Sequence, residues 1–165
     1  MELHTYSHRW ERRMPDWPAA AVAGLAAGAI LMLLELLWSI IVVGTDPWMT
    51  SHMIAAIVMG PSALQVTDFN VSLIAVALAT HYVLGIVFGL VLAAIIAPFH
   101  LDSSAGMALA VGAAFGLVLY LFNFYGMVRL FPWFAEIRGW PTVAAHLIFG
   151  MALAFIYRAL ERPNR

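Results

Sequence analysis

Four long apolar segments constrain the fold of this 165-residue chain more than any other feature. They cover residues 18–43, 71–97, 105–125 and 142–160, and each reaches the roughly 20 residues that span the apolar core of a bilayer. Charged residues make up only 10% of the chain, against about 25% in soluble domains. The pattern therefore predicts a single integral membrane domain over 1–165, an all-α bundle of four transmembrane helices within the lipid bilayer.

Local signals mark the ends of these helices. Pro18 and Pro141 suit a first helical turn, and Asn70 and Ser103 are candidate N-caps. Pro98 follows the second segment. We expect the helices to begin and end close to these residues.

A fifth apolar segment, 51–64, is too short to cross a bilayer. Thr50 or Ser51 can cap its start, and Gly60-Pro61 can end the helix. We expect a half-helix on the outer side of the membrane, either lying at the interface or re-entrant.

The distribution of arginine predicts the orientation in the membrane. Six arginines lie in the terminal segments, two lie in the loop at 126–141, and the chain has no lysine. Because positive residues favour the cytoplasmic side, both termini, including the N-terminal segment 1–17, are expected in the cytoplasm. Trp48, Trp133 and Trp140 are then expected at the outer membrane interface, and Arg138 is expected to be exposed with a small energetic role.

The four segments repeat one pattern of small and polar residues. A small-xxx-small helix with a polar residue seven positions further on is followed by a His-xxx-Gly helix. The members are Gly24, Gly28, Glu35, His81 and Gly85 in the first unit, and Gly112, Gly116, Asn123, His146 and Gly150 in the second. The pattern predicts a parallel two-helix repeat, in which the glycines let helix backbones approach closely.

Polar residues inside the predicted helices form the candidate ligand or proton site. Its centre is Glu35, His81 and His146, with Asn123 and His52 of the half-helix as supports. A charged carboxylate at this depth costs roughly 2.5–3.5 kcal/mol, so we expect Glu35 to be protonated or paired with one of the two histidines. The structural alternative is that these groups only hold neighbouring helices together.

Three kinds of function fit these residues. The first is a non-enzymatic relay or transport of protons or a small cation, by a homo-oligomer or a small subunit of a larger membrane complex. The second is a redox subunit that binds haem b through His81 and His146, or a divalent metal through Glu35 and the histidines. The third is a structural accessory protein.

Composition narrows these alternatives. The chain has neither cysteine nor lysine, which excludes thiolate metal sites and cofactors bound as a Schiff base. A formal net charge of −1 gives no basis for binding nucleic acid. The rise per residue places His81 and His146 about two turns apart in depth, which counts against haem. We therefore favour the proton or cation function.

Aromatic and polar residues of the second half also carry a resemblance to a family. They are Phe131-Pro132-Trp133, Glu136, Trp140 and His146-x-x-Phe149-Gly150, together with the His-bearing segment His81–Gly89. In these residues the chain resembles YagU-like bacterial inner-membrane proteins. The resemblance implies a bacterial inner (plasma) membrane and adds weight to His81, Glu136 and His146, but it implies no catalytic mechanism.

Overall fold

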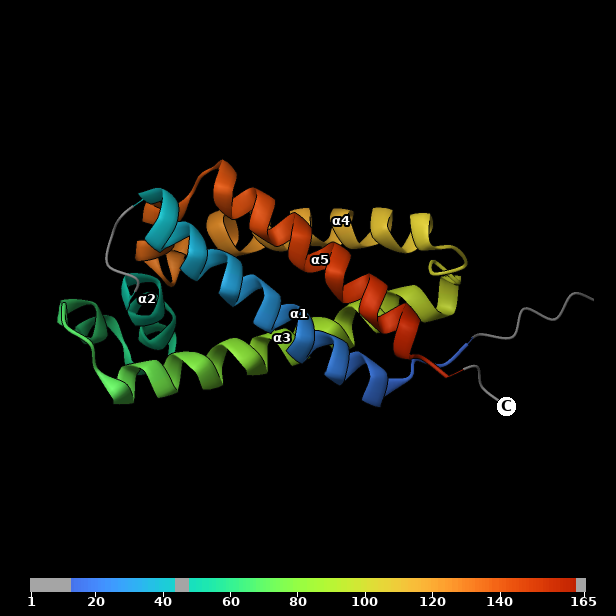
Figure 1. Cartoon of the computed structure of the whole chain (residues 1–165), viewed down its shortest axis with the longest axis horizontal. Helices are drawn as coiled ribbons and strands as arrows, with labels where there is room; N and C mark the ends of the chain where they lie inside the picture. The colour runs from blue at the N-terminus through green and yellow to red at the C-terminus, as the bar shows by residue number, and fades with distance from the viewer. Residues whose placement is uncertain (1–12, 44–47, 163–165) are drawn as a thin grey trace, which may run out of the picture.

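The computed structural model describes residues 13–43 and 48–162. Within these ranges the regular elements are all helices and none is a strand, and the four long helices form a bundle (Figure 1). They are α1 (Trp17–Trp38), α3 (Val71–Phe99), α4 (Ala105–Leu121) and α5 (Trp140–Leu160). The predicted all-α four-helix fold is therefore confirmed. Most of the expected N-terminal segment, including Arg9 and Arg12, lies outside the described residues.

Length and hydropathy show that the four helices can cross a membrane. The candidate spans are Trp17–Val42, Val71–Phe99, Ala105–Arg129 and Trp140–Leu160. Large apolar side chains such as Leu33, Val83 and Val118 are exposed on their outward surfaces. Because water-soluble monomers rarely expose extensive apolar surface, the chain is a multi-pass membrane protein.

The starts of the four long helices follow the predicted signals with one correction. Asp16 Oδ1 accepts a hydrogen bond from Ala19 N at the start of α1, and the Asn70 side chain caps α3. The cap of α4 is Ser104, whose hydroxyl accepts from Met107 N at 3.1 Å. The prediction of Ser103 is wrong by one residue, because Ser103 N donates to His100 O and closes the preceding turn.

Pro98 lies inside α3 rather than after it. The helix continues through Phe99 and ends where His100 adopts a left-handed conformation with φ 53°. Proline lacks the N–H that would bond the carbonyl four residues earlier, so Pro98 costs the helix one hydrogen bond, and only Phe99 follows it in the helix. The second helix is therefore slightly longer than the segment 71–97.

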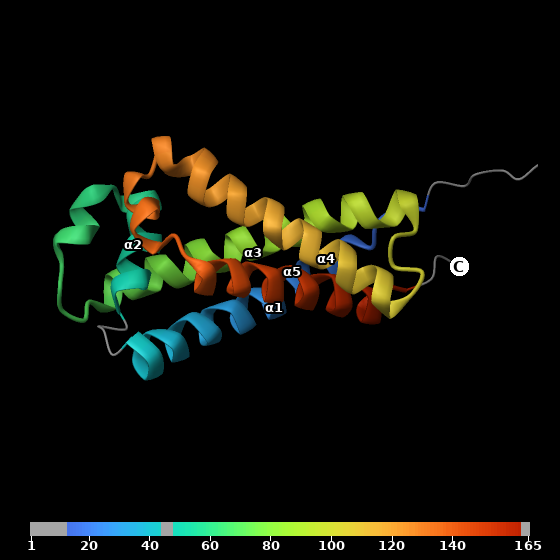
Figure 2. The same cartoon turned by 90° about the horizontal axis from the view of Figure 1, so that it is seen from above.

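The half-helix is α2 (Trp48–Met59), which begins earlier and ends sooner than the predicted 51–64. Neither Thr50 nor Ser51 caps it, since both lie inside it. Gly60 takes a φ of 85° and a short 3₁₀ turn, Pro61–Gln65, follows. A positive φ is open to glycine at little cost, so the helix ends there. Figure 2 shows α2 beside one end of α3, at the end of the bundle that we call the α2 end.

Close approaches at glycine join the long helices in two pairs, α1 with α3 and α4 with α5. A Cβ atom built on Gly85 would lie 2.8 Å from Gly24 O, and one on Gly150 would lie 3.0 Å from the Gly112 carbonyl carbon. The same positions of the predicted repeat thus meet in both pairs. Helix α1 also packs against α5 and so joins the pairs.

Ion pairs close the opposite end of the bundle, where both ends of the described chain meet; we call it the terminal end. Arg13 forms salt bridges with Asp102, in the loop between α3 and α4, and with Glu161, just after α5. Arg158 Nε donates to the Asp102 carbonyl at 2.9 Å. Burial, together with the neighbouring Asp102 carboxyl group, raises the pKa of Glu161. These contacts join the segment before α1, the loop between α3 and α4, and the end of α5.

Small and aliphatic side chains fill the half of the bundle near the terminal end. Its fully buried members include Ala20, Ala93, Ile96 and Leu153. Alanine and glycine let the helices approach closely, so this half is tightly packed. Polar groups within the bundle are therefore placed toward the α2 end.

Candidate functional site

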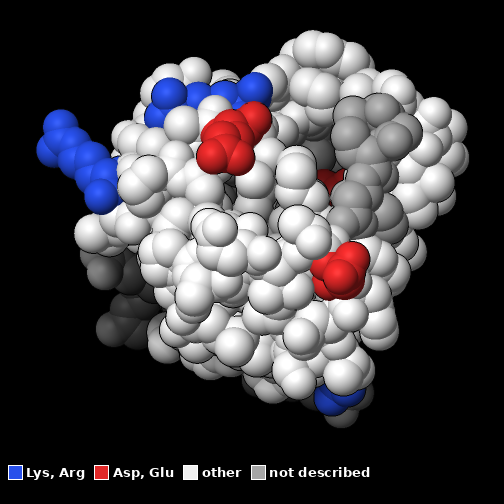
Figure 3. Space-filling view, turned by 90° about the vertical axis from the view of Figure 1, so that its left-hand side faces the viewer, with Lys and Arg blue, Asp and Glu red and all other residues white. Residues whose placement is uncertain are grey.

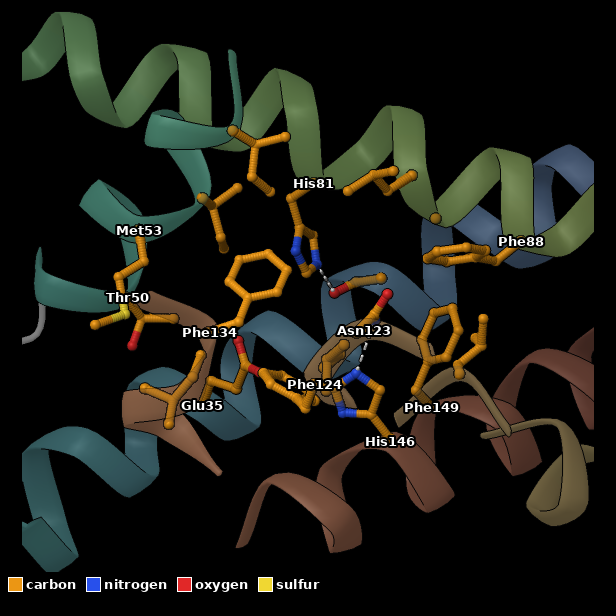
Figure 4. A pocket seen from close by; sticks show the side chains of 18 residues that line it. Glu35, Thr50, Met53, His81, Phe88, Asn123, Phe124, Phe134, His146 and Phe149 are labelled. Carbon is orange, nitrogen blue, oxygen red and sulfur yellow. Dashed lines mark hydrogen bonds between the residues drawn. The ribbon is translucent and has the colours of Figure 1, made fainter. Parts of the chain in front are cut away.

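A cavity of about 110 Å³ lies between the two helix pairs, toward the α2 end. Helices α1, α3 and α5 contribute to its walls, and α2 and a 3₁₀ segment, η5 (Pro132–Ile137), cover it. Four of the five predicted site residues line this cavity: Glu35, His81, Asn123 and His146 (Figure 4). The helices thus bring together side chains that are more than 100 residues apart in sequence.

His52, the fifth predicted residue, lies elsewhere. It is on α2 and is only 4% exposed, but it lines neither this cavity nor its neighbour. Its Nε2 has no hydrogen-bond partner within the described ranges. The half-helix instead covers the site with Thr50, Met53 and Ile54.

His81 is held by the close approach of α1 and α3. Its Nε2 lies 2.8 Å from the carbonyl oxygen of Gly28, one turn along α1 from Gly24. A carbonyl can only accept, so Nε2 carries the hydrogen and donates it. In the neutral ring Nδ1 then remains able to accept a proton.

His146 is held by its own helix and by the end of α4. Its Nδ1 lies 2.9 Å from the Thr142 carbonyl and its Nε2 lies 3.4 Å from Asn123 Nδ2. These partners assign the hydrogen to Nδ1 and leave Nε2 as the acceptor of the amide hydrogen. The ring therefore fits the neutral form.

Asn123 reaches His146 from a π-helical turn, η3 (Phe122–Gly126), that continues α4. Such wide turns often occur at functional sites. Arg138 Nε donates to the Phe124 carbonyl at 2.6 Å, and its guanidinium carbon lies 4.5 Å from the centroid of the Tyr125 ring. Arg138 is exposed, as predicted, but it also holds this turn in place.

Glu35 lies on α1 one turn before the helix widens into a second π-helical segment, Ser39–Val43. Its carboxyl group forms no ion pair with an arginine or histidine among residues 13–43 and 48–162. The expected pairing with His81 or His146 is absent, and the two rings bond the carbonyl groups of Gly28 and Thr142 instead. Of the two forms expected from the sequence, the protonated one fits this setting.

A second cavity of about 180 Å³ lies between α1, α2 and α3. Glu35, Thr50, Ile54 and His81 line both cavities. Figure 3 views the α2 end and shows acidic side-chain atoms inside a recess; Glu35 is the acidic residue that lines the cavities. The carboxyl group therefore stands between two spaces.

Phenylalanine side chains form much of the remaining wall. Phe88 and Phe149 make an edge-to-face contact, with ring centroids 6.4 Å apart, between the cavity and the tightly packed half. Phe124 and Phe134 lie near the cover, with centroids 5.7 Å apart. None of these four phenylalanines was predicted as a site residue. Helical spacing gave a signal for two of them, since Phe149 is three residues after His146 and Phe88 is seven after His81.

Trp133 departs from the predicted membrane-interface position. It is 7% exposed and donates a hydrogen bond from Nε1 to the Met53 carbonyl of α2 at 3.1 Å. The indole needs a partner for its single donor when it is buried, and the half-helix provides one. Trp133 therefore attaches the η5 cover to α2, whereas Trp140 is exposed, and its place at the outer membrane interface stays a prediction.

The site does not fit the cofactors considered above. In the described part of the chain, no three His, Asp or Glu side chains lie close enough together to hold a metal ion. An apolar cavity of about 150 Å³ holds one benzene molecule, so a haem is far too large for the space between His81 and His146. We therefore derive no chemistry from haem or metal.

Comparisons with known proteins found no relative of this chain. Neither the family models, nor the curated proteins, nor the solved structures contain a match to this chain. The resemblance to YagU-like proteins stays a prediction, and the chemistry of the site rests on its own residues.

Proposed function

We propose that this protein binds a proton or a small cation in the cavity and moves it across the membrane, with Glu35 as the binding group. The observation that carries the proposal is the position of this carboxyl group: Glu35 lines both cavities, and His81 and His146 line the first cavity with it. Ionisable residues are costly inside a membrane and typically mark a transport path.

The ring nitrogens of the two histidines make a proton relay chemically reasonable. His81 Nδ1 can accept a proton, and His146 Nε2 can do so when the weak 3.4 Å contact with Asn123 is given up. Glu35 can supply that proton or take it back. The arrangement needs no metal and no covalent chemistry.

The proposed orientation places the α2 end outside and the terminal end in the cytoplasm of a bacterial inner membrane. The arginines near the chain ends support it through the positive-inside rule. The cavities would then be nearer the outer side, while the Phe88–Phe149 contact and the packed half close the inner side. Passage inward therefore requires a second conformation in which that contact opens.

Reconstituted liposomes test this proposal. We expect a pH gradient to drive proton flux through the wild type, and Glu35→Gln to lower the rate at least 10-fold while the helical content stays unchanged. The matched control is Asp68→Asn, which changes an exposed acidic residue outside both cavities. Equal flux in wild type and Glu35→Gln would refute the proposed role of Glu35.

A further inference from the structure

We propose that the ligand of this cavity is a small organic ammonium ion. The inference rests on the proposed function, because it specifies the cation that the same site takes. Charge, size and wall chemistry each support it independently.

The charge of the site favours a cation. Glu35 is the one acidic residue and no arginine stands among the described residues that line either cavity. The histidine contacts fit neutral rings. An ionised Glu35 would therefore be the only formal charge in these walls, and a bound cation would neutralise it.

The size of the cavity favours an organic ion over an inorganic one. A single water needs only about 10–15 Å³ of such space, and about 150 Å³ holds benzene. A cavity of about 110 Å³ thus holds a molecule of about four to six heavy atoms. A hard metal cation takes six or more oxygen ligands, but only Glu35, Thr50 and Asn123 bring side-chain oxygens to this wall.

The aromatic walls supply the remaining contacts. Phe124 and Phe134 line the cavity with Glu35, and Phe88 and Phe149 close its far side (Figure 4). A cation within about 6 Å of an aromatic ring is attracted to the face of that ring. An alkylammonium ion can therefore place its charge between the carboxylate and the rings and its carbon atoms against Leu31 and Leu84.

Calorimetric titration of the detergent-solubilised full chain tests the inference with three probes of one shape. They are isobutylammonium, the neutral isobutanol and the anionic isobutyrate. We expect saturable binding of isobutylammonium alone, an apparent Kd at least 10-fold weaker in Glu35→Gln, and an unchanged Kd in Asp68→Asn, at an exposed residue outside both cavities. Phe134→Leu should weaken binding about 3- to 10-fold, while Phe155→Leu, on an exposed site of α5, should not.

The other outcomes overturn the inference. Binding of isobutanol as tight as that of isobutylammonium would show a merely apolar pocket, and binding unaffected by Glu35→Gln would show uptake elsewhere or by the micelle. Displacement by millimolar Na⁺ at equal affinity would show an inorganic cation site. If isobutylammonium does not bind but proton flux still depends on Glu35, the inference is wrong and the proposed function stands. If neither result is found, both proposals are refuted.

Discussion

His146 and Asn123 show how one contact can set the protonation of a ring. The Thr142 carbonyl accepts a hydrogen bond from Nδ1–H, so Nε2 carries no hydrogen and accepts one from the amide of Asn123. At 3.4 Å this second contact is long for a hydrogen bond, and it is correspondingly easy to exchange for a proton or a ligand.

Nitrogen NMR can test this assignment. We expect the wild type to show the neutral Nδ1-protonated form of His146 near neutral pH. Asn123→Leu should shift the Nε2 resonance of His146, because it removes the donor, and should leave the His81 resonances in place. A spectrum in which His146 carries its proton on Nε2 would contradict the hydrogen-bond pattern.

At the scale of elements, glycine sets the distance between helices. A Cβ atom on Gly112 would meet the backbone of Gly150 and lie 2.9 Å from the Ala154 side chain. A Cβ atom on Gly106, near the start of the same helix, would meet nothing within 4 Å. The two positions therefore make a matched pair on α4.

We expect Gly112→Ala to lower the free energy of unfolding by about 1–3 kcal/mol, because the helices must separate or shift to admit the methyl group. Gly106→Ala should leave it unchanged or raise it by up to about 1 kcal/mol, since alanine favours a helix. Unfolding of both variants in the same detergent measures the difference. Equal stability would mean that α4 and α5 are not held by this contact.

Much of the element level could be predicted from sequence, for physical reasons. Hydropathy and length determine which segments can span a bilayer, and the Gly24 and Gly112 patterns indicated where helices approach. The grouping of Glu35, His81 and His146 in one site was predicted, but the rise per residue placed the two histidines about two turns apart in depth. They line one cavity, because the rise per residue takes no account of how the helices tilt and cross. The sites of Trp133 and His52 also escaped prediction, because both depend on how α2 folds against the bundle.

For the whole molecule, Asp16 joins the two ends of the described chain. Its carboxylate accepts hydrogen bonds from Ala19 N and from Arg162 N, and its own backbone N–H donates to the Tyr157 hydroxyl. The bond from Ala19 N foremost, and then that from Arg162 N, lowers the pKa of Asp16 below its usual 3.8.

This lowered pKa predicts a sign for the pH dependence of stability. The contribution of Asp16 is fully present above pH 3.8 and is lost as the pH falls through the lower pKa of the folded state. Thermal unfolding should therefore show a loss of stability as the pH falls below 3.8, and Asp16→Asn should reduce this loss. Asp68→Asn, at an exposed residue, is the control. An identical loss in wild type and Asp16→Asn would contradict the assignment.

The crossing of α1 and α3 at Gly24 and Gly85 also has a mechanical consequence. Backbone contact at this point leaves little room for sliding, so the easier relative motion is rotation about it, as in a pair of scissors. Glu35 lies about 16 Å along α1 from this pivot, so a rotation of about 10° displaces it by about 3 Å. The width of the space around Glu35 thus depends on the crossing angle of α1 and α3. A bound ion of a given diameter selects the crossing angle that fits it.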